Sequence, residues 1–202
     1  MPTADFFGRL GLFVLRDFFD AELCARLRSE TCLAAGGQAM ITRKGTDLID
    51  ESVRRTKWVE VPPSTNVFVE SRLSALKPML ERHFCVVLKG CERPQFLIYK
   101  GGDFFLPHQD SQTDPDVSPC VRERRVSVAI FLNGEARKPK QDNYGGGSLT
   151  FYGLIDDDPR WKPCGFGLIG EAGMVIAFRS DVLHEVTPVT HGERYTIVTW
   201  FS

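Results

Sequence analysis

The chain has 202 residues and a mass of 22.7 kDa, and its 25 Lys and Arg against 26 Asp and Glu give a formal net charge of −1. Hydrophobic residues make up 43% and charged residues 25%, values that exclude a disordered, collagen-like or coiled-coil protein. The near-zero charge removes the main electrostatic reason to expect a nucleic-acid or anionic-membrane partner, so we expect one compact domain over residues 1–202.

The amino-terminal segment, residues 1–15, has no basic region, no continuous apolar stretch and no small-residue cleavage site, so we expect no signal peptide. No apolar run elsewhere approaches the ~20 residues of a membrane span. The six cysteines are scattered without a Cys-x-x-Cys pair, which favours reduced thiols in a cytoplasmic protein and leaves a Cys85–Cys91 disulfide as the alternative.

The first half of the chain predicts two helices and two short strands. An apolar run indicates a strand over 10–15, and Asp20 is placed to cap a helix over 21–34 whose leucines recur at helical spacing. A second short strand is expected at 58–61, just before two prolines. Leucines and valines at helical spacing then predict an amphipathic helix over 66–83.

From about residue 95 onward the chain has the texture of β-structure. Five segments rich in β-branched and aromatic residues are separated by Gly and Pro clusters, and these predicted strands are 95–99, 125–132, 148–152, 172–178 and 195–201. No long helix stands between them, which favours an antiparallel sandwich or barrel over parallel βαβ units. We therefore expect an α+β protein, mostly β, with the amino-terminal helices packed on one sheet.

His108 and Asp110 are the first candidate pair of metal ligands. In an extended segment, which Pro107 favours, side chains two residues apart leave the same face of the strand. An imidazole beside a carboxylate makes two-thirds of a facial iron site, and His184, which follows an apolar strand, is the best candidate for the third ligand. The alternative for His108 is a surface histidine in a polar loop.

Arg194 opens the last predicted strand and is a candidate anion-binding residue. Strand alternation places Arg194, Thr196, Val198 and Trp200 on one face. A guanidinium on the inner face of a small barrel needs an anionic partner, and its planar fork suits a carboxylate. Pairing with Glu185 or Glu193 at the rim is the alternative.

Together these residues resemble a known family. The order of 99–110 (YKGGDFFLPHQD), 125–133 (RVSVAIFLN), 145–151 (GGGSLTF), 184–194 (HEVTPVTHGER) and Trp200 looks like the catalytic domain of prolyl 4-hydroxylase-like, Fe(II)- and 2-oxoglutarate-dependent dioxygenases. The resemblance is close over 94–202 and loose over 1–93. It implies a double-stranded β-helix (a cupin-like jelly roll) as catalytic core over 94–202, supported by residues 1–93.

The resemblance also implies roles for individual residues. His108, Asp110 and His184 would bind the iron, and Arg194 would hold the distal carboxylate of 2-oxoglutarate. The expected lining of the co-substrate pocket is Tyr99, Ser127 and Thr196. The chain departs from some members at Phe131, where they carry a tyrosine that helps to bind the distal carboxylate.

The implied activity is hydroxylation of a C–H bond with decarboxylation of 2-oxoglutarate to succinate and CO₂. It would use Fe(II) and O₂, with ascorbate as a reductant. A prolyl residue in a protein or peptide is the leading substrate, and a free amino acid or other small metabolite is the alternative. A third hypothesis is a non-catalytic jelly-roll binding module. We expect three polar segments to act as lids over the site: 36–57, 111–124 and 134–147. Their basic residues would attract an acidic substrate or peptide, and the alternative is that these charges are ordinary solvent-exposed groups on loops.

Overall fold

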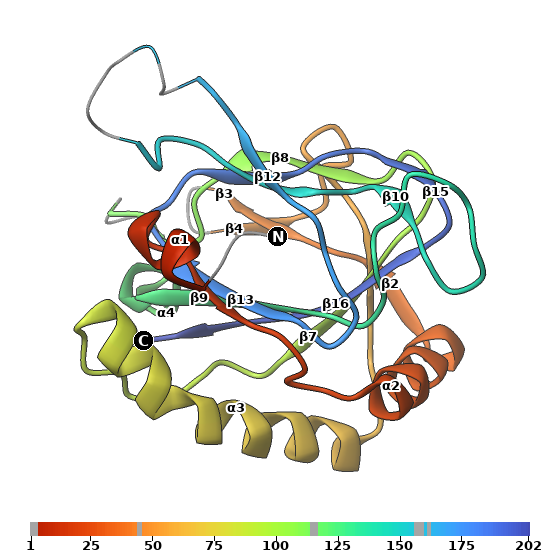
Figure 1. Ribbon diagram of the computed structural model, residues 1–202, viewed down its shortest axis with the longest axis horizontal. Coiled ribbons are helices and arrows are strands. Elements are labelled where there is room, and N and C mark those ends of the chain that lie inside the picture. The colour runs from red at the N-terminus through yellow and green to blue at the C-terminus, as the bar shows by residue number, and fades with distance from the viewer. Residues whose placement is uncertain (1–3, 44–45, 114–116, 156–159, 161–162) are drawn as a thin grey trace.

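Two stacked antiparallel sheets form the body of the protein (Figure 1). The computed structural model describes residues 4–43, 46–113, 117–155, 160 and 163–202. The larger sheet has the order β1 (Phe13–Leu15), β13 (Val175–Arg179), β9 (Val126–Phe131), β16 (Arg194–Phe201), β7 (Gln95–Tyr99), β6 (Lys57–Val59) and β2 (Gly36–Gln38). The smaller sheet has the order β12 (Phe166–Leu168), β11 (Leu149–Phe151), β14 (His184–Val186), β8 (Phe104–His108) and β5 (Arg54–Arg55).

Two short ribbons and four helices complete the described part of the chain. The ribbons pair β10 (Gly145–Gly146) with β15 (Val189–His191) and β3 (Ile41–Arg43) with β4 (Thr46–Leu48). The helices are α1 (Ala4–Arg9), α2 (Ala21–Leu33), α3 (Pro63–Phe84) and α4 (Pro119–Glu123). This mostly β architecture confirms the predicted jelly roll with supporting helices.

The larger sheet is buried on both faces. Val126, Val128 and Ile130 of β9 join the core that α2 and α3 cover, whereas Ala129 and Phe131 join the core between the two sheets. Figure 1 shows α2 and α3 on the side of this sheet that faces away from β8. Alternate residues of a strand point to opposite faces, so a strand covered on both sides is hydrophobic throughout.

The predicted helices are confirmed, with one shifted boundary. Asp20 caps α2 by accepting a hydrogen bond from the Leu23 amide at 2.8 Å. The second helix begins at Pro63 rather than at residue 66, because proline at the first helical position has no amide hydrogen to leave unpaired. It ends at Phe84, and the capping residue Cys85 adopts the left-handed conformation.

The segment 36–57 contains short strands that the sequence analysis did not predict. β2 packs against β6 so tightly that a Cβ at Gly36 would lie 2.0 Å from the Trp58 carbonyl oxygen. Only glycine permits this approach. Polar, glycine-containing strands of two or three residues carry little alternation, which is why local pattern does not reveal them.

All six cysteines are free thiols, so the Cys85–Cys91 disulfide does not form. Within the described residues, no helix has the length and apolar character needed to cross a membrane.

Candidate metal centre and the cavity around it

Two neighbouring strands of the smaller sheet bring the candidate metal ligands together. β8 and β14 pair antiparallel, and His108 lies directly opposite His184 in their register. Asp110 follows β8 in a bend, where its amide donates to the Ser180 carbonyl at 2.9 Å. The fold therefore joins stretches of chain that are more than 70 residues apart.

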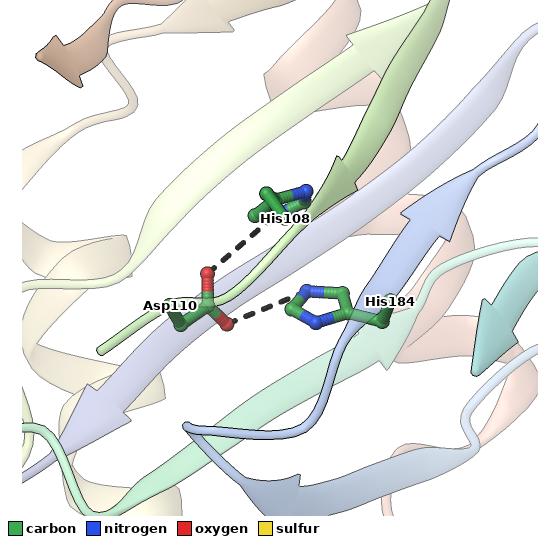
Figure 2. A group of neighbouring side chains, drawn as sticks. All are labelled: His108, Asp110 and His184. Carbon is green, nitrogen blue, oxygen red and sulfur yellow. Dashed lines mark ion pairs between the residues drawn. The ribbon is translucent and has the colours of Figure 1, made fainter. Parts of the chain in front are cut away.

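The three side chains converge on one point. Figure 2 shows the Asp110 carboxylate between the two imidazoles, 3.6 Å from His108 Nε2 and 3.5 Å from His184 Nε2. One potential ligand atom from each residue lies within 4.8 Å of the other two. Two imidazoles and one carboxylate this close can hold a single ion from one side and leave its remaining coordination positions open.

Local hydrogen bonds orient both imidazoles for metal binding. His108 Nδ1 lies 2.8 Å from the Leu106 carbonyl oxygen, and His184 Nδ1 lies 2.9 Å from the Val182 carbonyl oxygen. A carbonyl oxygen can only accept, so Nδ1 carries the proton in each ring and Nε2 keeps its lone pair. Both Nε2 atoms face the Asp110 carboxylate, and this arrangement is typical of metal-binding histidines.

Burial and nearby charges set the protonation states of His184 and Asp110. Burial lowers the pKa of His184 to about 4, so this imidazole is neutral at pH 7. For Asp110, burial by itself would raise the pKa, but the two histidines and a hydrogen bond with Ser127 hold it well below its usual range. A neutral imidazole and an ionised carboxylate are the forms that bind a divalent cation.

Arg194 lies at the start of β16, inside the core rather than at the rim. It is 2% exposed, and its guanidinium carbon lies 5.0 Å from the Tyr99 ring centre and 5.1 Å from that of Phe131. Nη1 donates to Thr196 Oγ1 at 3.2 Å, while Nε has no hydrogen-bond partner. Within the described residues, no carboxylate pairs with this guanidinium.

The rim alternative for Arg194 is not what the structure shows. Glu193 instead pairs with Lys100 at 3.1 Å and accepts a hydrogen bond from the Tyr195 hydroxyl. Glu185 accepts from the Tyr152 hydroxyl. The two acids are therefore occupied elsewhere. Glu135 is near enough to interact electrostatically with Arg194, but its carboxylate accepts from Ser148 Oγ and, within the described residues, forms no ion pair with this guanidinium.

The other predicted pocket residues divide between the two ends of the site. Tyr99 stacks on the guanidinium of Arg194, and Thr196 accepts its hydrogen bond. Ser127 lies at the metal end, where its side chain hydrogen-bonds to Asp110 and its oxygen lies 2.9 Å from Ser180 Oγ. Ser127 is thus a neighbour of the candidate metal ligands rather than a helper of Arg194.

Tyr144 is a neighbour of Arg194 that the sequence analysis missed. Its side chain is fully buried, and its hydroxyl lies beside Arg194 without a hydrogen bond of normal geometry. Burial raises its pKa to about 12, although the charge of Arg194 acts in the opposite direction. Gly147, with φ +60°, makes room here, because a Cβ would lie 3.1 Å from Arg194 Cδ. The sequence signal that could have identified Tyr144 is its position directly before the glycine run 145–147.

Arg124 lines the cavity and contacts the backbone of Asp110. Its guanidinium forms two hydrogen bonds with the Glu92 carboxylate, at 2.6 and 2.8 Å, and lies 3.7 Å from the centre of the Trp200 ring. Nη1 also donates to the Asp110 carbonyl oxygen at 3.3 Å. Arg124 therefore helps to fix the backbone of Asp110. No sequence signal indicated this role, because Arg124 is one of several charged residues in a polar segment.

One cavity of about 720 Å³ contains the three candidate ligands and Arg194. Residues of segment 36–57 line it, as does α4 with the turn before it, so two of the three expected lids border the site. Of the described part of segment 134–147, no residue lines the cavity. Gly147 and Tyr144 of this segment lie beside Arg194 instead.

Comparison with known proteins identifies a family for this arrangement. The family model described as the 2OG-Fe(II) oxygenase superfamily matches residues 94–202. A PKHD-type hydroxylase from Alteromonas mediterranea is 36% identical over 88 residues, which are 42% of this chain and 31% of that protein. A PKHD-type hydroxylase from Rhizorhabdus wittichii is 32% identical over 110 residues, which are 54% of this chain and 42% of the relative. The chain thus matches less than half the length of these relatives.

Solved structures share the fold at low sequence identity. A prolyl-4-hydroxylase from Pseudomonas putida aligns with a TM-score of 0.66 and 22% identity, covering 95% of this chain and 91% of the other. A prolyl hydroxylase from Trichoplax adhaerens, solved with a peptide fragment of the hypoxia inducible factor oxygen degradation domain, aligns with a TM-score of 0.71 and 18% identity. That alignment covers 95% of this chain and 83% of the other. Because the family model matches more than half of its residues, the chain belongs to the 2OG-Fe(II) oxygenase superfamily.

Proposed function

We propose that this member of the 2OG-Fe(II) oxygenase superfamily is a dioxygenase that hydroxylates a C–H bond and converts 2-oxoglutarate to succinate and CO₂. The observation that carries the proposal is a buried guanidinium without an acidic partner, Arg194, in the same cavity as two imidazoles and a carboxylate. A metal centre and an anion-binding residue in one cavity are what a metal-bound dicarboxylate requires.

His108, Asp110 and His184 would hold the iron. Two neutral imidazoles and one carboxylate contribute a single negative charge, so a divalent ion keeps a positive charge that attracts an anionic co-substrate. Bound iron supplies the oxidising chemistry, with O₂ as oxidant and ascorbate as an external reductant. The protein's own residues bind and orient the reacting groups.

Arg194 would bind the distal carboxylate of 2-oxoglutarate. An unpaired charge in the interior is costly, and a carboxylate that enters the cavity relieves that cost while forming charge-assisted hydrogen bonds. Thr196 and the faces of Tyr99 and Phe131 restrict the rotation of the guanidinium, which prepares it for one ligand orientation.

Aromatic side chains pack against both imidazoles of the candidate metal centre. The Phe105 ring stacks on His108 with 3.5 Å between ring centres, and Phe178 lies edge-on to His184 at 4.6 Å. Such contacts restrict the orientation of both imidazoles, which prepares them to hold a metal ion.

A prolyl residue in a protein or peptide is the proposed substrate. The names of the matched relatives and solved structures support it, and a cavity of about 720 Å³ is far larger than one small dicarboxylate needs. A free amino acid or other small metabolite is the second candidate, since the same cavity can close around one. An unpaired buried guanidinium in the same cavity as three candidate metal ligands is costly to maintain and has no purpose in a purely structural module. This arrangement disfavours the hypothesis of a non-catalytic binding module.

Succinate formation tests the proposal directly. The purified chain with Fe(II), 2-oxoglutarate and ascorbate should release succinate, and His108→Ala should reduce the rate by more than about 100-fold. His83→Ala, in α3 on the far side of the larger sheet, is the matched control and should keep the wild-type rate. Equal rates in the wild type and His108→Ala would refute the metal assignment.

A further inference from the structure

Four arginines line the cavity, and they differ in their partners: Arg54, Arg93, Arg124 and Arg194. Two of them pair with carboxylates, Arg93 with Glu60 and Arg124 with Glu92. Among the residues that the structure describes, Arg54 and Arg194 have no carboxylate partner. The proposed function gives Arg194 the distal carboxylate of 2-oxoglutarate, whereas it gives Arg54 no anion.

Arg54 is as well enclosed as a core residue. It belongs to β5, is 8% exposed and lies opposite Phe105 of β8 in the strand register. Nη1 donates to the Met40 carbonyl oxygen at 2.9 Å, but Nε is buried without a hydrogen-bond partner. One neutral acceptor is too little for a group with five donors and a permanent charge.

The position of Arg54 relates it to the reacting centre. Its guanidinium carbon lies 4.7 Å from the centre of the Phe105 ring, and that ring stacks on the metal-site imidazole of His108 at 3.5 Å. One aromatic ring therefore separates the charge from a candidate iron ligand. Arg194 approaches from β16 in the other sheet, so the two guanidinium groups enter the cavity from opposite walls.

We propose that Arg54 binds a carboxylate of the substrate that is hydroxylated, so that the enzyme selects acidic substrates. The inference rests on the proposed function, because it assigns the second anion site of the same cavity. A planar guanidinium with a free Nε matches a carboxylate through two parallel hydrogen bonds, and the face of Phe105 keeps the fork in place. The carboxylate can come from an acidic side chain of a peptide or from the α-carboxylate of a free amino acid.

Arg55 provides a matched control on the same strand. It is exposed, lies over the Phe104 ring and approaches Glu51 at 4.0 Å. Successive strand residues point to opposite faces, so Arg55 carries the same charge in the same element without lining the cavity. A general effect of net charge would appear equally in Arg54→Gln and Arg55→Gln.

Calorimetry on the full chain, saturated with Mn(II) and 2-oxoglutarate so that Arg194 is occupied, tests the proposal. The probes are blocked prolyl pentapeptides with Glu at one flanking position, each matched by a Gln peptide, and free proline matched by prolinamide. We expect the wild type to bind the best carboxylate probe about tenfold more tightly than its neutral match. Arg54→Gln should abolish that preference, Arg54→Lys should keep part of it, and Arg55→Gln should keep all of it.

The pattern of binding identifies the carboxylate's source. Preference confined to one Glu position indicates an acidic peptide, and preference for proline over prolinamide indicates an amino acid. A wild type that binds no probe, or binds matched probes equally, would overturn the proposal, as would equal preference in Arg54→Gln and the wild type. Succinate release without peptide is measured separately, so failure of the oxygenase assignment is distinguishable from failure of this inference.

Discussion

Both imidazoles of the metal centre take their orientation from the chain itself. Each donates to a carbonyl two residues earlier, His108 to Leu106 and His184 to Val182, so the tautomer that leaves Nε2 free is fixed locally. What is not local is the meeting of the two rings, whose centres lie 4.3 Å apart. The site combines short-range orientation with long-range convergence.

Replacement of Arg194 should impair co-substrate binding more than chemistry. We expect Arg194→Ala to raise the KM for 2-oxoglutarate by about 100-fold, since charge-assisted hydrogen bonds to a buried carboxylate are lost. Arg194→Lys should show an intermediate KM, because a lysine keeps the charge without the planar fork. Steady-state succinate assays measure both, and an unchanged KM in Arg194→Ala would place the anchor elsewhere.

Tyr144 offers a residue-scale test of stability. Its buried hydroxyl forms no hydrogen bond of normal geometry, and an unpaired buried polar group costs free energy. Tyr144→Phe should therefore increase the free energy of unfolding of the ligand-free protein by about 1 kcal/mol. Urea denaturation monitored by tryptophan fluorescence measures the change. A loss of stability would show that the hydroxyl is satisfied in solution.

At the scale of the element, β16 shows how a single strand serves two cores. Tyr195, Ile197 and Phe201 face the helices, whereas Arg194 and Trp200 face the cavity. Period-two alternation predicted this division from sequence. The partner strands β7 and β9 then place β16 in the middle of the larger sheet, which is why every residue but Val198 is buried.

The cap of α2 can be tested by itself. Asp20→Ala should lower the free energy of unfolding by about 1 kcal/mol, because the Leu23 amide loses its acceptor at the helix start. Asp20→Asn should be nearly neutral, since an asparagine oxygen caps as well as a carboxylate. Thermal unfolding followed by circular dichroism distinguishes the two variants. Equal loss in both would indicate that charge rather than capping matters here.

At the scale of the whole molecule, residues 1–93 contribute more than a covering. β2 and β6 extend the larger sheet, β5 extends the smaller one, and α2 and α3 bury the outer face of the larger sheet. We therefore propose that 1–93 supports a catalytic core at 94–202 within one cooperative domain. Arg54 on β5 links this support to the cavity.

A truncated chain should not fold alone. A fragment of residues 94–202 would expose the sheet face that α2 and α3 cover and leave the edges of β7 and β8 unpaired, so we expect an unfolded or aggregated product. Size-exclusion chromatography and near-ultraviolet circular dichroism test this, with the full chain as control. A monomeric fragment with native tertiary signal would show that the core is independent.

Sequence by itself determined the two long helices, the β texture of the chain after residue 95 and the chemistry of the candidate ligands. Alternation in the strands, the Asp20 cap and the helical spacing of leucines act over a few residues, so each can be detected within a short window. The order of motifs around His108, His184 and Arg194 then indicated the family.

Only the tertiary structure decided which charges are satisfied. Within the described residues, Arg54 and Arg194 lack a carboxylate partner, whereas Arg124 pairs with Glu92. These differences, like the position of Tyr144, depend on segments that are neighbours in space but distant in sequence. The free energy of a buried charge depends on what surrounds it in three dimensions, and no local pattern of residues carries that information.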